Sequence, residues 1–179
     1  MFNKLVTVVI NGIRNIGKKN YRNLLCIDKT TIISVDNKAK FNVGYKFRTR
    51  KNVEINVRDG ANLNIGNNVF LNSGCIITAR EKIQIGDNTI MGPYVIIYDN
   101  DHKITNGEIE HNSYDTAPII IGKNVWIGAG TIILRGTEIG DNCVIASGTV
   151  VKGRIDSRTV LIQKRSSLKK AIRKEREEN

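Results

Sequence analysis

Large aliphatic residues recur every six positions over most of residues 65–151, with one eight-residue step from Ile77 to Ile85 and one long interruption after Ile97. A helix repeats its buried positions every 3.6 residues and a simple strand every two, so neither element explains a period of six. A short strand followed by a sharp corner does, because three such faces close a triangular coil on which further coils stack. The strands of an ordinary β-sandwich have no fixed six-residue step. The repeat occupies Ile65, Leu71, Ile77, Ile85, Met91, Ile97, Ile121, Ile127, Ile133, Ile139, Ile145 and Val151.

Composition supports a β-rich fold, and the repeat divides the chain into three parts. The chain contains 28 Ile and 14 Val against 8 Leu, and β-branched side chains suit strands better than helices. We predict an all-β fold with a β-helix domain over residues 41–163. Residues 1–40 form a cap that begins with a helical segment, because the apolar residues within 1–25 share one helical face. Residues 164–179 form a basic C-terminal helix.

The interruption of the repeat predicts one long loop, at about residues 98–118, expelled from a corner of the coil. Long ordered loops in compact domains are usually functional. Both histidines of the chain, His102 and His111, lie in this loop. His102 stands where the last regular strand leaves the coil, and a neutral imidazole can take the proton of a hydroxyl. We therefore predict that His102 is a general base, oriented by Asp99, by Asp101 or by a backbone carbonyl.

The net charge of +11 resides at the two ends of the chain. Residues 1–52 carry a net +10, residues 53–163 a net −3 and residues 164–179 a net +4. The basic ends lack a recognised nucleic-acid-binding fold and the aromatic platforms of single-strand binders, so nucleic acid is not the expected partner. A basic amphipathic N-terminus can instead lie on an anionic membrane or pack across a second copy of the chain.

Cysteine usage and hydropathy bear on the cellular location of the protein and on its disulfide and zinc chemistry. Cys26, Cys75 and Cys143 stand far apart without a CxxC pair, which argues against a disulfide framework and a cysteine zinc site. Cys75 and Cys143 fall on the small-residue column of the repeat, so we expect both in the core. The apolar run Leu5 to Ile10 is far shorter than the roughly 20 residues that span a bilayer. We expect a cytoplasmic protein, with the inner face of the membrane as the alternative location.

The repeat, the loop with His102 and the run Pro118-Ile-Ile-Ile-Gly-Lys-Asn-Val-Trp-Ile-Gly resemble the hexapeptide-repeat acyltransferases. These features look like the maltose and galactoside O-acetyltransferase branch, and cell-surface polysaccharide O-acetyltransferases of similar size share them. The resemblance implies a left-handed parallel β-helix, acetyl-CoA as acyl donor without a metal, and a homotrimer with its sites between subunits. It also implies that His102 is the general base.

The same resemblance implies roles for further residues. Asn72 and Glu108 match positions that contact the sugar acceptor, whereas an aspartate of the sugar enzymes falls near Ala79 or Arg80 here. Trp126 is expected beside the CoA groove or in a subunit contact. The usual family ending is absent, since the chain reads Leu161-Ile-Gln-Lys-Arg. The positions implied for acetyl-CoA are Trp126, Gly128, Ala129, Ser147, Lys152 and Arg165.

These observations predict an acetyl-CoA-dependent O-acetyltransferase acting on a sugar hydroxyl of a cell-surface or capsular polysaccharide, or of its precursor. Transfer is expected to be direct, without an acyl-enzyme. The alternatives are an N-acetyltransferase on a nucleotide-linked amino sugar, a xenobiotic acetyltransferase and a non-enzymatic β-helix scaffold. A zinc carbonic anhydrase on this fold needs three histidines, and the chain has two.

Overall fold

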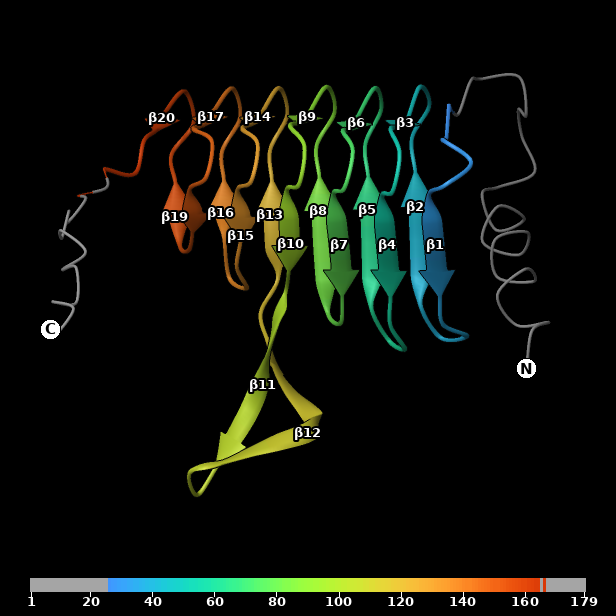
Figure 1. The fold of residues 1–179 in the computed structure, drawn as a ribbon, viewed down its shortest axis with the longest axis vertical. Helices are drawn as coiled ribbons and strands as arrows, with labels where there is room; N and C mark the ends of the chain where they lie inside the picture. Colours follow the sequence, from blue (N-terminus) through green and yellow to red (C-terminus); the bar gives the residue numbers. More distant parts are fainter. Residues whose placement is uncertain (1–25, 165, 167–179) are drawn as a thin grey trace, which may run out of the picture.

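A computed structural model describes residues 26–164 and Ser166, which form a three-sided prism of stacked coils with one projecting hairpin (Figure 1). The predicted N-terminal helix, Arg165 and nearly all of the predicted C-terminal helix lie outside the described residues. All regular elements of the described part are strands, so the predicted all-β fold is confirmed. In this part of the chain, no helix has the length and apolar character needed to cross a membrane.

Each of six coils contributes three strands. The first two coils contain β1 (Ile32–Val35), β2 (Lys40–Val43), β3 (Arg48–Thr49), β4 (Glu54–Val57), β5 (Asn62–Ile65) and β6 (Phe70–Leu71). The third and fourth contain β7 (Ile76–Ala79), β8 (Lys82–Ile85), β9 (Ile90–Met91), β10 (Ile96–Tyr98), β13 (Ile119–Ile121) and β14 (Trp126–Ile127), with the hairpin strands β11 (Asn100–Thr105) and β12 (Glu108–Thr116) inserted after β10. The last two contain β15 (Ile132–Ile133), β16 (Glu138–Ile139), β17 (Val144–Ile145), β18 (Val150–Val151), β19 (Arg154–Ile155) and β20 (Val160–Leu161).

The coils stack in register into three parallel six-stranded sheets. Sheet 1 has the order β1-β4-β7-β10-β15-β18, sheet 2 the order β2-β5-β8-β13-β16-β19, and sheet 3 the order β3-β6-β9-β14-β17-β20. We call the turns between them the 1–2, 2–3 and 3–1 corners. The inward positions carry the predicted six-residue repeat, and every repeat position is buried. The β-helix inferred from that repeat is therefore confirmed.

The coils shorten toward the C-terminal end of the prism. The first strands are four residues long, whereas most of the later ones have two. The β-helix begins at Ile32, inside the 1–40 segment that the sequence analysis assigned to a cap, because these longer coils do not keep the six-residue rhythm. Paired residues are 22 positions apart for Ile33 and Ile55, 20 for Leu63 and Ile83, 18 for Ile121 and Ile139, and 16 for Ile145 and Leu161.

The outward faces of the three sheets differ in polarity. The outward ladder of sheet 2 is mostly polar and consists of Asn42, Asn64, Gln84, Ile120, Glu138 and Arg154. The ladder of sheet 1 is mostly aliphatic and consists of Ile32, Glu54, Ile76, Ile96, Ile132 and Val150. The outward ladder of sheet 3 is apolar except for Arg48, and it consists of Arg48, Phe70, Ile90, Trp126, Val144 and Val160. Two adjoining faces of the prism are therefore apolar.

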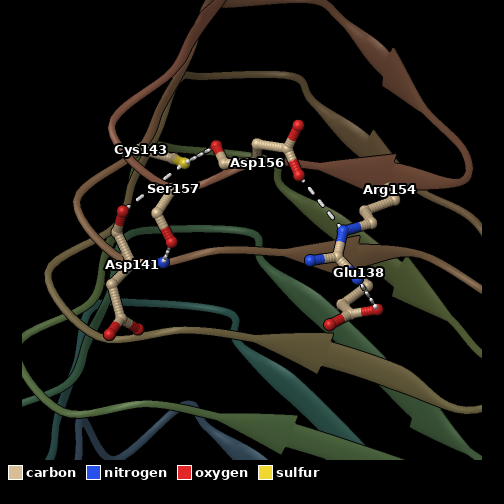
Figure 2. Close-up of polar contacts among 6 residues, drawn as sticks. All are labelled: Glu138, Asp141, Cys143, Arg154, Asp156 and Ser157. Atoms are coloured by element: carbon tan, nitrogen blue, oxygen red, sulfur yellow. Dashed lines mark hydrogen bonds and ion pairs between the residues drawn. The ribbon is translucent and has the colours of Figure 1, made fainter.

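Polar contacts fasten the last coil to the one before it (Figure 2). The backbone amide of Asp141 donates to the hydroxyl of Ser157 at 3.1 Å. The guanidinium of Arg154 lies 3.1 Å from the carboxylate of Asp156 and 3.8 Å from that of Glu138. Arg154 is therefore paired within the coils rather than free to meet an anion from solution.

Candidate active site

The predicted 98–118 loop is an ordered antiparallel hairpin of β11 and β12. It projects from the 1–2 corner of the fourth coil, on the side of the prism away from sheet 3 (Figure 1). The expelled segment was predicted correctly, and its pairing as two strands was not predicted. The turn between the strands contains Asn106 and Gly107, both with positive φ (54° and 84°). Asn-Gly favours this kind of two-residue hairpin turn, and this was the signal in the sequence for the hairpin.

His102 lies on β11, close to the base of the hairpin, and its side chain is exposed. Its Nδ1 lies 3.3 Å from the backbone carbonyl oxygen of Glu110 on β12. A carbonyl oxygen can only accept, so in the neutral ring Nδ1 carries the hydrogen and Nε2 is left as the basic nitrogen. Of the three orienting groups considered from the sequence, the backbone carbonyl is the one beside the ring.

Asp99 and Asp101 anchor the hairpin instead. The carboxylate of Asp99 is fully buried and accepts three backbone amide hydrogen bonds, at 2.8 to 2.9 Å, from residues 80–82 in the corner of the third coil. The carboxylate of Asp101 lies 2.6 Å from Nε of Arg135 in the fifth coil, and this hydrogen bond raises the pKa of the Arg135 guanidinium. The hairpin base is thus fixed to the coils on both sides of it.

The ring of His102 also contacts an aromatic side chain that sequence reasoning did not single out. Tyr114, its cross-strand partner on β12, has its ring centroid 4.7 Å from that of His102. The guanidinium of Arg80 lies over the Tyr114 ring, 3.4 Å from its centroid. Arg80 and His102 therefore both contact Tyr114 at the 1–2 corner, a contact between distant segments that no local motif reveals.

Four of the predicted binding residues share a different edge of the prism, the 3–1 corner. Asn72 lies there in the second coil, and its side-chain oxygen accepts the backbone amide of Ser73 at 2.8 Å. Gly128 and Ala129 form the corner of the fourth coil, and Ser147 lies in the corner of the fifth. Trp126, 57% exposed, stands on the outward face of sheet 3 directly before this corner.

Two backbone amides at this corner have no partner, unlike the equivalent amides of the 2–3 corner. Within the part of the chain that the structure describes, the amides of Ala129 and Ser147 make no hydrogen bond. A Cβ on Gly92 or Gly128 would sit 2.6 Å and 2.5 Å from these two nitrogens, so glycine keeps them uncovered. In the 2–3 corner, the equivalent backbone amides donate to side chains of the next coil. The donor and acceptor residues are Tyr45 and Asn67, Asn67 and Asp87, Lys123 and Asp141, and Asp141 and Ser157.

The remaining predicted residues lie on the side of the hairpin. Glu108 is exposed near the hairpin tip, where it pairs with Thr105. Lys152 is exposed in the 1–2 corner of the sixth coil. Arg165 lies outside the described residues. Within one chain, His102 is therefore on the 1–2 corner and the free amides are on the 3–1 corner, at opposite edges of sheet 1.

The cysteines differ in their environment. Cys26 is exposed, whereas Cys75 and Cys143 are buried as predicted. Burial raises the pKa of the Cys75 thiol to about 11. The thiol of Cys143 donates to the carbonyl oxygen of Asp156 at 3.1 Å (Figure 2). Among residues 26–164 and 166, no cluster of His, Cys, Asp or Glu could hold a metal ion.

We expect iodoacetamide at pH 8 to alkylate Cys26 alone in the folded protein. The thiolate is the reactive form, and neither buried thiol is accessible to the reagent. Intact mass should show one adduct per chain, and peptide mapping should place it on Cys26. In denaturant all three cysteines should react. Rapid alkylation of Cys75 in the folded protein would contradict its burial.

Comparison with known proteins agrees with this fold. The model of the bacterial transferase hexapeptide (six repeats) matches residues 118–153. The galactoside O-acetyltransferase of Escherichia coli (strain K12) is 36% identical over 92 residues, which cover 51% of this chain and 45% of that protein. A putative lipopolysaccharide biosynthesis O-acetyl transferase of the same organism, WbbJ, is 26% identical over 140 residues, or 71% of this chain and 69% of that one. The chain spans about half the length of the first of these relatives.

A solved structure supports the architecture. AntD, an N-acyltransferase from Bacillus cereus in complex with dTDP and 3-hydroxybutyryl-CoA, superposes with a TM-score of 0.60 at 19% identity. The alignment covers 84% of this chain and 81% of that one, and this likeness concerns the fold alone. The chain thus contains the hexapeptide repeat of the bacterial transferases, folds as the β-helix that this repeat encodes, and resembles the galactoside O-acetyltransferases in sequence.

Proposed function

We propose that the protein is an acetyl-CoA-dependent O-acetyltransferase that acts on a sugar hydroxyl of a cell-surface or capsular polysaccharide, or of its precursor. The observation that carries this proposal is the environment of His102, whose Nδ1 faces a carbonyl and whose Nε2 is left free to accept a proton. The similarity to sugar O-acetyltransferases supports the reaction, and the similarity to WbbJ supports a surface glycan.

The reaction is a direct transfer. Nε2 of His102 takes the proton of the acceptor hydroxyl while the hydroxyl oxygen attacks the thioester carbonyl carbon of acetyl-CoA. The C–S bond then breaks, and the imidazolium returns its proton to the leaving thiolate of CoA. The acetyl group ends on the sugar oxygen, and the base is regenerated. Cys75 and Cys143 are buried, so neither is in a position to form an acyl-enzyme.

The acetyl-CoA arm is proposed to run along the 3–1 corner. The free amides of Ala129 and Ser147 belong to successive coils, about 4.8 Å apart, and can donate to the carbonyls of an extended pantetheine chain. Trp126 lines this groove, and Gly128 keeps it open. Lys152 and Arg165 are the proposed partners of the CoA phosphates, since Arg154 is already paired with Asp156 and Glu138.

A second copy is proposed to complete the site, because His102 and the free amides lie on opposite edges of sheet 1. Three copies that turn their apolar sheet 1 faces toward a common axis bring the 1–2 corner of one beside the 3–1 corner of the next. The proposed assembly is therefore a homotrimer with sites between subunits. The proposed location is the cytoplasm, with residues 1–25, outside the described part, as the segment that would meet an anionic membrane.

Replacing Ala129 by proline tests the acetyl-CoA site. The same corner position in the third coil is Pro93, also preceded by glycine, so the coil tolerates proline there. The Ala129→Pro substitution removes one unpaired amide hydrogen, and we expect the Kd for CoA to rise about tenfold. Isothermal titration measures this, with Pro93→Ala as the matched control that leaves the Kd unchanged. Absence of CoA binding by the unmodified protein would refute the proposed function.

Co-expression of two variants tests the shared site. His102→Ala chains lack the base, and Ala129→Pro chains bind acetyl-CoA weakly. If each site combines two chains, hybrid trimers recover roughly a quarter of the unmodified kcat/KM for acetyl-CoA. If each site lies within one chain, the hybrids show only the residual activity of the Ala129→Pro chains and gain nothing from mixing, and sedimentation shows whether trimers form at all. Mass analysis of the products from hydroxyl and amino sugars separates O-acetylation from N-acetylation.

A further inference from the structure

Arg80 carries a positive charge that nothing in the described part of the chain neutralises. Its Nε is buried and has no hydrogen-bond partner, and the side chain makes no ion pair among the described residues. One face of its guanidinium is covered by the ring of Tyr114. Arg58, one coil earlier in the same column, also has a buried Nε without a hydrogen-bond partner, but its guanidinium lies 3.9 Å from Asp36, and Arg135 is held by Asp101.

Three carboxylates around the hairpin already have partners of their own. Asp99 is saturated by three backbone amides, and Asp101 pairs with Arg135. Glu110 accepts the hydroxyl of Thr105, and this hydrogen bond is the largest cause of the lowered pKa of Glu110. A guanidinium that is partly removed from water without a counter-ion is costly to the fold. Such a group, planar and stacked on an aromatic ring, is suited to bind an oxyanion through two parallel hydrogen bonds.

The Arg80 guanidinium lies near His102, and this position is suited to binding the acceptor. Arg80 lies over the Tyr114 ring, and the Tyr114 ring contacts the His102 ring, so the guanidinium and the base contact the same aromatic side chain. We propose that Arg80 binds the carboxylate or phosphate of an anionic glycan, and that His102 deprotonates a hydroxyl of that same glycan. This inference rests on the proposed function and names its acceptor class. It also accounts for a cation near the place where the sugar enzymes implied an aspartate.

The test compares acceptors that differ only in charge. Methyl β-D-glucuronide and methyl β-D-glucoside 6-phosphate supply a carboxylate and a phosphate, and methyl β-D-glucoside is the neutral reference. We expect the unmodified protein to have a higher kcat/KM for one of the two anionic glycosides than for the neutral glucoside. The preference is measured as the ratio of these two kcat/KM values. The Arg80→Gln substitution should lower this ratio at least about tenfold, mainly through KM, because it removes a charge-assisted hydrogen bond. Arg58→Gln is the matched control and should leave the ratio unchanged.

A purely structural role of Arg80 gives a different result. If Arg80 only supports Tyr114, then Arg80→Gln lowers kcat/KM for neutral and anionic acceptors alike, the ratio is unchanged, and the proposal is overturned. Arg80→Lys keeps the charge but loses the planar fork, so it should restore the ratio only in part.

Binding without turnover separates this inference from the proposed function. Saturation-transfer NMR of the three glycosides with the His102→Ala protein should detect the preferred anion, and the signal should disappear in the double variant with Arg80→Gln. No detectable binding of either anion overturns the inference, whatever the CoA titration shows. Binding of an anion by a protein that does not bind CoA would instead refute the acetyltransferase and retain the anionic ligand.

Discussion

Replacing His102 by alanine should lower acetyl transfer between about 10²- and 10⁴-fold while the protein stays folded. The side chain is exposed on the hairpin, and within the described part of the chain it meets the Glu110 carbonyl and the Tyr114 ring, so its loss opens no cavity in the core. The release of CoA thiol in the presence of an acceptor measures the rate, and thermal unfolding by circular dichroism checks the fold.

The second histidine provides the matched control for this substitution. His111 lies on the same hairpin and is also exposed, so His111→Ala removes an equal volume and the same chemical group. Its rate should remain close to that of the unmodified protein. Turnover by His102→Ala within a few fold of the unmodified rate would rule out the assignment of the base.

Replacing Asp99 by alanine should have the largest effect on stability among the surface-loop residues. Its buried carboxylate accepts three backbone amides of residues 80–82, and alanine leaves these donors without partners. A loss of about 3 kcal/mol is expected, because each buried unpaired group costs roughly 1–3 kcal/mol and the cavity admits some water. The melting temperature should fall by about 6–12 °C, as measured by differential scanning calorimetry.

Asp101→Ala is the control for Asp99. Its ion pair with Arg135 is partly exposed, so its removal should cost no more than about 1 kcal/mol. Both substitutions loosen the base of the hairpin, but only Asp99→Ala should also lower turnover strongly, since it frees the corner on which Arg80 and Tyr114 rest. Equal melting temperatures for the two variants would show that the three amide contacts of Asp99 add little.

The six-residue repeat made the β-helix predictable. The repeat is irregular in the first coils, and this explains why the start of the β-helix was misplaced. Aliphatic residues such as Ile121, Ile127 and Ile133 each mark an inward position of a short strand, so sequence spacing and spatial register coincide there. In the first coils the strands of sheets 1 and 2 are four residues long, and the pattern drifts because inward positions are added to these two faces. The boundary at residue 41 was therefore placed too late, although Ile33 is already in the core.

The site was predictable only where it depends on chain order. His102 was proposed because it follows the break in the repeat, whereas the residues of the 3–1 corner were proposed from the resemblance to the hexapeptide-repeat acyltransferases. The stack of Arg80 on Tyr114 could not be found, since it joins a corner to a strand more than thirty residues later through the fold of the hairpin. The partner of His102 was left open for a similar reason, because a backbone carbonyl has no signature in the sequence.

The shortening of the coils has a consequence for how copies of the chain can meet end to end. A parallel β-helix presents an open backbone edge at each end, and such edges can template the addition of further strands. Here the separation of paired residues falls from 22 positions at the first coil to 16 at the last. The perimeter of one end therefore does not match that of the other, and a head-to-tail stack would misalign both its hydrogen bonds and its aliphatic columns. The taper thus protects the protein against growth into fibres.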